Sequence, residues 1–493
     1  DNKLIIGAPF HPGGAALTGQ LASAPTYPSH RKMAPPSELK IIEVFQVSPP
    51  TAAAAPFSLP LTQWDVQWLR FAPTQRLFFY EASEACDSFT PSVLPPLKHS
   101  LSLALRHFQP LAGALVWPPD SDEPYVRVNG DSAGISLTVA ESGADFRHLC
   151  GDGPRDSAEF RPLVPCLAAG RDRAAVMALQ VTNFPGRGFS IGVTAHHAVI
   201  DGRAVQMFVK SWAHLCRAVR NGDGTEGLPS ELTPFYDRSG VRDPGGDKQA
   251  SLKWWLNETG PDGRSLEVFE MTPPEGTVRA TFRLPSTDIE VLRRHVDARA
   301  AAPIRASSFV LACAYAWVCL AKAEGMEREK TAYFCFPADL RARVKPPLPP
   351  TYFGNCISGL MGAVPAANLV SCSGIVAAAE ALSGQIWALK EDAPSSVAET
   401  WAAVWRVFLS GRVVSVAGSP QFKVYETDFG WGRVRKAEIV STEKTGALAL
   451  SENGGGGGGI EIGVVLGEGV MKTYAATFSD DLAAIKDEST KCY

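Results

Sequence analysis

Apolar positions along the chain repeat with two different periods, one typical of helices and one typical of strands. In Leu97–Phe108 they recur every three or four residues, which predicts an amphipathic helix that ends before Pro110. Arg203–Val219 has the same spacing and predicts a second helix. Residues 41–47 and 189–195 are short apolar runs that predict strands. The chain therefore mixes helices and strands, as an α/β fold does.

Two later segments extend this pattern. Phe309–Ala321 is an almost continuous apolar run of thirteen residues. This is shorter than the roughly 20 residues that cross a membrane, so we expect a helix buried in the core. Val278–Leu284 alternates apolar and polar residues and predicts a half-buried strand.

The pattern weakens in the middle of the chain. Asn221–Asp247 loses its periodicity and gains glycine, proline and aspartate, which is typical of an exposed crossing between domains. We place a domain boundary near residue 235. Residues 33–235 would then form an N-terminal domain and residues 236–493 a C-terminal domain.

The first residues have a different texture from the rest. Residues 1–32 are rich in glycine, alanine, proline and serine and show weak periodicity, whereas a more regular pattern opens at Met33. We interpret residues 1–32 as a non-native or disordered extension and expect the functional protein to start near Met33.

Charge and cysteine content exclude several classes of protein. The 47 basic and 51 acidic side chains give a net charge of −4, and no long basic stripe is present, so nucleic acid is not an expected partner. The ten cysteines are scattered without a C-x-x-C pair, and the chain does not open with a signal segment. We expect free thiols and a cytoplasmic protein, with no membrane as a partner.

The main candidate for catalysis is a histidine between a predicted strand and a predicted helix, in HHAVIDG at residues 196–202. An imidazole with an unperturbed pKa of about 6.5 can accept a proton from an alcohol at neutral pH. Adjacent strand residues point to opposite faces, so at most one of the two histidines reaches a given pocket. Structural roles are also open, because Asp201 can cap the helix and Gly202 can relieve the backbone at the turn. A metal would need a third ligand besides His197 and Asp201, so we expect none.

Two other segments match the sequence patterns of known functional sites, but their context argues against those functions. GFSIG at residues 188–192 matches the G-x-S-x-G pattern of serine hydrolases, but the strand continues through Val193 where a nucleophile elbow requires a helix. Ser190 is therefore expected in the middle of a strand. The six glycines Gly454–Gly459 satisfy G-x-G-x-x-G trivially, and we predict a flexible hairpin connection there instead of a phosphate loop.

Two motifs far apart in the chain together resemble a known enzyme family. His197-x-x-x-Asp201-Gly202 and DFGWG at residues 428–432 resemble the paired signatures of the plant BAHD acyl-CoA-dependent acyltransferases. The resemblance covers essentially all of Met33 to about Ala484. Other segments that carry it are LPLTQWDVQWL at Leu59, RLFFY at Arg76, LKHSLSLALRHFQPLAGAL at Leu97 and YFGNC at Tyr352. RLFFY and YFGNC look most like the branch that contains anthocyanin and phenolic glucoside malonyltransferases.

This resemblance implies a two-domain fold similar to that of chloramphenicol acetyltransferase, with mixed sheets flanked by helices and a channel between the domains. It implies that acyl-CoA enters from one side as a co-substrate and a hydroxylated acceptor from the other, with no permanently bound cofactor. His197 would be the general base that deprotonates the acceptor hydroxyl, which attacks the thioester without an acyl-enzyme. Asp201 would be structural and turned toward an arginine, for which Arg279 is our candidate.

The resemblance also gives roles to the remaining motif residues, beside which simpler roles stand. The DFGWG turn would shape the fold or the coenzyme channel, and a glycine-relieved turn with packed aromatic side chains explains it equally. That turn consists of Asp428, Phe429, Gly430, Trp431 and Gly432. Ser307 and Ser308 resemble the place where the family holds the coenzyme, because a helix N-terminus suits an anion. As capping residues they need no ligand.

One position departs from the malonyltransferase pattern. Val205 stands where certain anthocyanin malonyltransferases carry an arginine suited to the malonyl carboxylate, and the nearby Arg203 is at a helix start where solvation is common. We expect a monomeric acyltransferase that moves malonyl from CoA to a hydroxyl of a phenolic or flavonoid glycoside. The alternatives are a hydroxycinnamoyl donor, a serine esterase that uses Ser190, and an inactive relative that only binds ligands.

Overall fold

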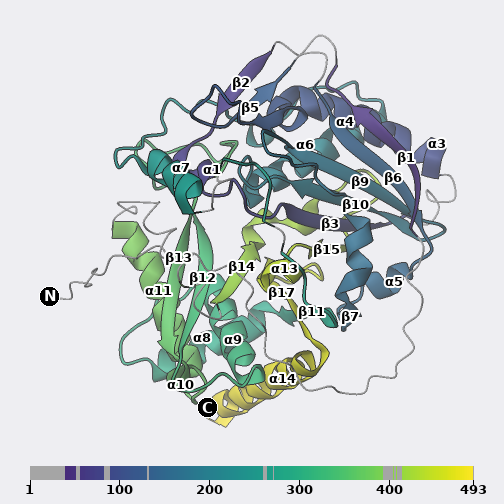
Figure 1. The fold of residues 1–493 in the computed structure, drawn as a ribbon. Coiled ribbons are helices and arrows are strands. Elements are labelled where there is room, and N and C mark those ends of the chain that lie inside the picture. Colours follow the sequence, from purple (N-terminus) through teal and green to yellow (C-terminus); the bar gives the residue numbers. More distant parts are fainter. Residues whose placement is uncertain are drawn as a thin grey trace. The chain divides into compact units, whose positions relative to one another are not determined.

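The strands of the computed structural model form three β-sheets, with helices packed against them (Figure 1). The structure describes residues 39–50, 56–82, 89–129, 133–258, 264–269, 271–391, 404, 407 and 413–491. The predicted extension at residues 1–32 lies outside the described residues. The mixture of sheets and helices confirms the predicted α/β class.

A six-stranded sheet carries the strand that leads to HHAVIDG. Its order is β1 (Leu39–Val47), β6 (Ile135–Ser142), β9 (Met177–Phe184), β10 (Gly188–Ala195), β3 (Thr74–Glu81) and β15 (Lys436–Ile439). Strand β10 pairs antiparallel with both β9 and β3, and all eight of its residues are buried. Helices α4 (Leu94–His107) and α6 (Gly202–Asn221) share one apolar core with this sheet. The predicted strands and helices of this region are confirmed.

A seven-stranded sheet forms the framework of the later part of the chain. Its order is β13 (Ile357–Pro365), β12 (Thr331–Asp339), β14 (Val413–Gly418), β16 (Leu448–Glu452), β17 (Ile460–Gly467), β11 (Thr277–Leu284) and β7 (Arg155–Asp156). Helices α8 (Ser286–Arg299), α9 (Ser308–Ala323), α11 (Gly374–Glu391) and α14 (Glu468–Lys491) pack with this sheet around a second core. Residues 310–321 of α9 are all buried, as its apolar run predicts.

The remaining elements are short. A four-stranded sheet has the order β2 (Phe57–Pro60), β5 (Tyr125–Val128), β4 (Ala114–Val116) and β8 (Arg173–Ala175). The other helical elements are α1 (Gln63–Val66), α3 (Phe89–Ser92), η2 (Gln109–Ala112), α5 (Phe146–Leu149), η4 (Ser157–Leu163), η5 (Ser230–Leu232), α7 (Asp247–Glu258), α10 (Ala366–Leu369), η6 (Pro420–Phe422), η7 (Val424–Glu426) and α13 (Thr442–Thr445).

Two strands cross the predicted division near residue 235. Strand β7 comes from the first part of the chain but pairs with β11 in the seven-stranded sheet. Strand β15 comes from the last part but pairs with β3 in the six-stranded sheet. Each sheet therefore includes one strand from the other side of the predicted boundary, and the boundary itself stays a prediction.

The glycine run connects two antiparallel strands. Strands β16 and β17 pair with Glu452 opposite Ile460, so Gly454–Gly459 lies in the turn between them. This confirms the predicted hairpin.

The described ranges contain neither a helix that could span a membrane nor a cluster of metal-binding side chains. None of the helices there has the length and apolar content needed to pass through a lipid bilayer. In those same ranges no three histidine, cysteine, aspartate or glutamate side chains gather where they could hold a metal ion.

Candidate active site

The site is built at the turn between β10 and α6. The strand ends at Ala195, the helix begins at Gly202, and the intervening turn is closed by a hydrogen bond from the Val199 amide to the His196 carbonyl, 3.0 Å long. Because β10 is buried and paired on both edges and α6 packs in the same core, the two elements fix both ends of the turn. The predicted order of strand, turn and helix is confirmed.

His197 is half-buried between two aromatic rings. Its imidazole stacks on Trp68, with ring centroids 3.9 Å apart and planes 9° apart, and meets Phe71 edge-on at 5.9 Å. Burial and the positive charge of Arg76 lower the pKa of His197 to about 4. The imidazole is therefore neutral at pH 7, which is the form that can accept a proton.

His196 lies in a different environment from its neighbour. It is fully buried, and its Nδ1 accepts a hydrogen bond from the Ala198 amide at 3.3 Å. Burial, and then the neighbouring His197, lower the pKa of His196 to about 4 as well. Only His197 of the two keeps part of its surface exposed, in line with the expectation that a single histidine reaches a pocket.

Asp201 holds the turn from inside. One carboxylate oxygen, Oδ1, accepts from the Ala204 amide at 2.9 Å, which confirms the predicted N-cap of α6. The other, Oδ2, pairs with Arg341 Nη2 at 2.8 Å and accepts from the Cys356 amide at 3.3 Å. Although burial opposes it, the negative charges of Asp201 and Asp339 raise the pKa of Arg341 above its ordinary value. Asp201 is thus fully engaged with protein groups.

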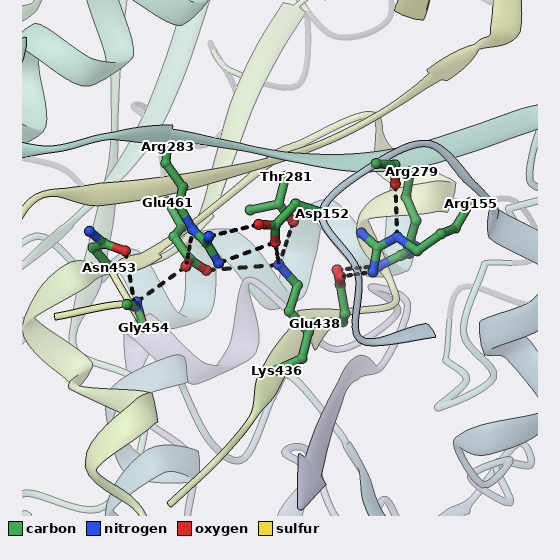
Figure 2. A network of polar contacts seen from close by, with 12 residues as sticks. Asp152, Arg155, Arg279, Thr281, Arg283, Lys436, Glu438, Asn453, Gly454 and Glu461 are labelled. Atoms are coloured by element: carbon green, nitrogen blue, oxygen red, sulfur yellow. Dashed lines mark hydrogen bonds and ion pairs between the residues drawn. The ribbon is translucent and has the colours of Figure 1, made fainter. Parts of the chain in front are cut away.

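The arginine that faces Asp201 is Arg341, so our candidate Arg279 was wrong. Arg279 lies in β11 and pairs with Glu438 of β15 at 2.9 Å, and Arg155 binds the other oxygen of the same carboxylate at 2.9 Å (Figure 2). Burial tends to raise the pKa of Glu438, but the two arginines outweigh it and hold that pKa at about 2. Arg279 was misassigned because ion pairing between distant residues depends on the packing of the sheets, which the sequence does not display.

Gly202 is required for space and not for its backbone conformation. Its φ does not lie in the left-handed region, so the predicted backbone relief is not the reason for a glycine. A Cβ at this position would lie 2.6 Å from Arg76 Nη2 and 3.1 Å from the Phe422 ring. The absence of a side chain at Gly202 therefore lets the Arg76 guanidinium lie against the start of α6.

Asp65 and Asn355 form a buried support that the sequence analysis missed. The Asn355 side chain donates to the His197 carbonyl at 2.8 Å and to Asp65 Oδ1 at 3.0 Å, and the Asn355 amide donates to the same oxygen at 2.9 Å. Arg238 pairs with Asp65 Oδ2 at 2.7 Å. The LTQWD and YFGNC segments entered the sequence analysis only as carriers of the resemblance. Their buried polar residues meet at the back of the histidine turn.

The DFGWG segment forms the predicted glycine-relieved turn. Asp428 Oδ1 accepts from the amides of Gly430 at 2.6 Å and Gly432 at 3.1 Å, and both glycines have a left-handed φ, of 99° and 103°. Phe429 is buried edge-on against Trp212, with centroids 4.9 Å apart. Trp431 meets Phe189 edge-on at 5.6 Å. A role of this turn in a coenzyme channel stays a prediction.

The serines at the start of α9 are exposed, and one of them is a cap. Ser307 is the N-cap residue, and its hydroxyl accepts from the Val310 amide at 3.3 Å. Ser308 is the first residue of the helix. Capping is therefore confirmed for Ser307, whereas coenzyme binding by Ser307 and Ser308 stays a prediction.

Two alternatives from the sequence lose support. Ser190 is fully buried in the middle of β10, as predicted, where a substrate does not reach a nucleophile. Arg203 is not simply solvated, because its Nε lies 2.8 Å from Asp339 Oδ2. Val205 is buried in the core of α6. Neither Arg203 nor Val205 therefore offers a free cation to a substrate carboxylate.

The chain is similar to known proteins in sequence and in fold. A model of a protein family described as the Transferase family matches residues 39–481. Malonyl-CoA:anthocyanidin 5-O-glucoside-6''-O-malonyltransferase of Arabidopsis thaliana is 39% identical over 451 residues, which cover 90% of this chain and 98% of that protein. Phenolic glucoside malonyltransferase 2 of the same plant is 38% identical, with coverage of 90% and 99%. The crystal structure of vinorine synthase, 19% identical, has a TM-score of 0.66 and covers 91% of this chain and 98% of that one, so the fold is shared.

Proposed function

This chain belongs to the BAHD family of acyl-CoA-dependent acyltransferases, and from that premise we propose that it transfers a malonyl group from malonyl-CoA to a hydroxyl of a phenolic or flavonoid glycoside. It is an acyltransferase with the two-domain fold of that family, and acyl-CoA is its co-substrate. The names of the two relatives, a malonyltransferase of an anthocyanidin glucoside and one of phenolic glucosides, support both the donor and the acceptor.

His197 is the general base in this proposal. Nδ1 is buried without a hydrogen-bond partner among the described residues, so Nε2 is the nitrogen left for a substrate. It accepts the proton of the acceptor hydroxyl while the oxygen attacks the thioester carbonyl, and collapse of the tetrahedral intermediate breaks the C–S bond. The proton on the imidazole then passes to the departing CoA thiolate, which restores the neutral histidine. A positioned base of this kind commonly contributes about 10²- to 10⁴-fold in rate.

The surrounding network keeps the imidazole in place. Asp201 acts through Arg341 and the helix cap, and Asn355 acts through the His197 carbonyl. These are positioning residues, because both carboxylate oxygens of Asp201 and the side-chain nitrogen of Asn355 are occupied by protein groups. Stacking on Trp68 leaves the ring little freedom to turn, which favours one orientation toward the acceptor.

The finer features of the proposal follow the family resemblance. We infer a channel between the two domains that admits the thioester and the acceptor from opposite ends. We infer coenzyme contacts at Ser307 and Ser308, whose exposed position at the start of α9 is compatible with an anion. We also infer a monomer. We infer that it is cytoplasmic, which the free thiols Cys166 and Cys372 on the surface support.

The observation that carries the proposal is a neutral imidazole on a partly exposed residue, at the turn shared with the family motif. The test is product analysis by mass spectrometry after incubation with malonyl-, coumaroyl- or acetyl-CoA and a mixture of flavonoid glucosides. We expect malonyl adducts, a loss of about 10²- to 10⁴-fold for His197→Ala, and near-normal activity for Ser190→Ala. Coumaroyl adducts alone would replace malonyl by the aromatic donor, and loss of activity only in the serine variant would favour an esterase.

A further inference from the structure

Arg76 is a buried arginine without an anionic partner. It lies in β3 with 6% of its surface exposed. Its Nε is buried without a hydrogen-bond partner, and no ion pair or hydrogen bond joins the guanidinium to any residue in the described ranges. Its close contacts are Gly202 and, at 5.5 Å from the ring centroid, Phe422. The charge of Asp201 attracts the guanidinium from nearby, but the Asp201 carboxylate is already paired with Arg341. A formal positive charge is thus held inside the protein without an ion pair of its own.

Other buried arginines of the described chain are treated differently. Arg155 and Arg279 share the carboxylate of Glu438, and Arg341 pairs with Asp201. Removal of an arginine from water is unfavourable unless a partner compensates its charge. For Arg76 the cost of burial is visible, because burial lowers the pKa of the guanidinium to about 10 although the charge of Asp201 opposes it. A buried cation that lacks a protein partner is a candidate for a ligand.

Arg76 lines a small cavity. The cavity has a volume of about 30 Å³ and is walled by Phe78, Phe422 and Leu450, with Ser451 as a polar neighbour. Two carboxylates also border it, but both are already paired. Glu438 points toward Arg155 and Arg279, and Glu461 lies 3.0 Å from Arg283 (Figure 2).

The cavity lies next to the proposed reaction centre. The Arg76 guanidinium occupies the space that a side chain at Gly202 would fill, five positions after His197 in the chain. Its charge is close enough to act on the imidazole of His197 and on the carboxylate of Asp201. It also lies at the N-terminus of the 20-residue helix α6, where the helix dipole adds positive potential.

We propose that Arg76 binds the free carboxylate of the malonyl donor while the thioester end of the same acyl group lies at His197. This inference rests on the proposed function. A guanidinium binds a carboxylate through two parallel hydrogen bonds, which suits a short acyl chain with one terminal charge. The neighbouring candidates do not compete, because Val205 is apolar and Arg203 is held by Asp339.

The test compares two donors on one acceptor glucoside. We expect Arg76→Gln to lower kcat/KM for malonyl-CoA by roughly 10²-fold or more and kcat/KM for acetyl-CoA by less than about threefold, because acetyl has no carboxylate to bind. Arg203→Gln is the matched control, and it should leave the ratio of the two donors unchanged. An equal loss with both donors would overturn the proposal, and it would indicate that Arg76 holds a coenzyme phosphate or supports the fold. An unchanged malonyl rate would overturn it as well.

A binding measurement separates this inference from the proposed function. Monomethyl malonate should raise the Tm of the wild-type protein relative to sodium chloride at equal ionic strength, and it should not raise the Tm of Arg76→Gln. Without the ligand, the variant should melt at or above the wild-type temperature, which shows that it folds. If the wild-type protein transfers no malonyl group, the proposed function fails. If the wild-type and variant proteins respond equally to monomethyl malonate, the carboxylate site fails.

Discussion

Arg279 and Arg76 are both buried in the sheets of this protein, yet their charges are handled in opposite ways. Arg279 shares the carboxylate of Glu438 with Arg155, whereas Arg76 forms no ion pair with any described residue. Burial lowers the pKa of both side chains, and a negative charge opposes it in each case: Glu438 for Arg279, which it also binds directly, and Asp201 for Arg76, which it does not pair with. The difference indicates that the Glu438 cluster serves the stability of the fold, while the cavity beside Arg76 keeps a charge without an ion pair for the proposed ligand.

The largest expected effect on stability comes from removing the carboxylate that Arg155 and Arg279 share. Glu438→Gln would leave two buried guanidinium groups without a carboxylate, and we expect it to lower the free energy of unfolding by about 3–5 kcal/mol. Arg76→Gln removes a buried charge that has no ion pair and should leave the free energy of unfolding unchanged or raise it. Urea denaturation of both variants at pH 7.5 measures the contrast. Equal destabilisation by the two substitutions would show that Arg76 is as well compensated as Arg279.

The lowered pKa values of His196, His197 and Glu438 make the stability of the fold depend on pH in two different ranges. His196 and His197 have a pKa of about 4 in the folded protein, below the ordinary value of 6.5, so the unfolded chain binds more protons between these values. Stability should therefore fall as pH is lowered from 6.5 to 4, by up to about 1.4 kcal/mol per pH unit for each histidine. Glu438, with a pKa of about 2 against the ordinary 4.5, loses its contribution only as pH falls from 4.5 to 2.

Thermal denaturation between pH 7.5 and 4.5 tests the histidine window. His196→Asn is the control. It should reduce the fall of Tm with decreasing pH by about the contribution of one histidine. A wild-type Tm that stays constant down to pH 5 would contradict the lowered pKa values. The same pKa of His197 predicts that kcat/KM for malonyl transfer stays level through pH 6.5, whereas an ordinary histidine base would lose half its activity there.

The smallest expected effect concerns the serine that caps α9. Ser307→Ala removes the hydroxyl that accepts from the Val310 amide and should cost about 1 kcal/mol of stability. The KM for malonyl-CoA separates the two roles of this serine. An unchanged KM would restrict Ser307 to capping, and a KM raised severalfold would support coenzyme binding. Ser308→Ala serves as the comparison, because Ser308 is not the capping residue.

Local features of this protein were predictable from its sequence. The strand at residues 189–195, the helix after Asp201, the buried helix α9 and the glycine hairpin all appear where apolar spacing and turn residues predict them. The N-cap role of Asp201 and the glycine-relieved DFGWG turn were predictable for the same reason. Each depends on residues only a few positions apart, so the chain itself specifies them.

The partners of the buried charges depended on the tertiary structure. Asn355 reaches Asp65 across 290 residues, Arg279 reaches Glu438 across 159, and Asp201 faces Arg341 instead of our candidate. Such pairs form only after the sheets and helices have packed, because the energy of a buried ion pair depends on distances that no local spacing sets. The sequence by itself therefore determined the helices, the strands and the histidine motif. Only the packing decided that Arg341 holds the turn and that Arg76 is buried without an ion pair.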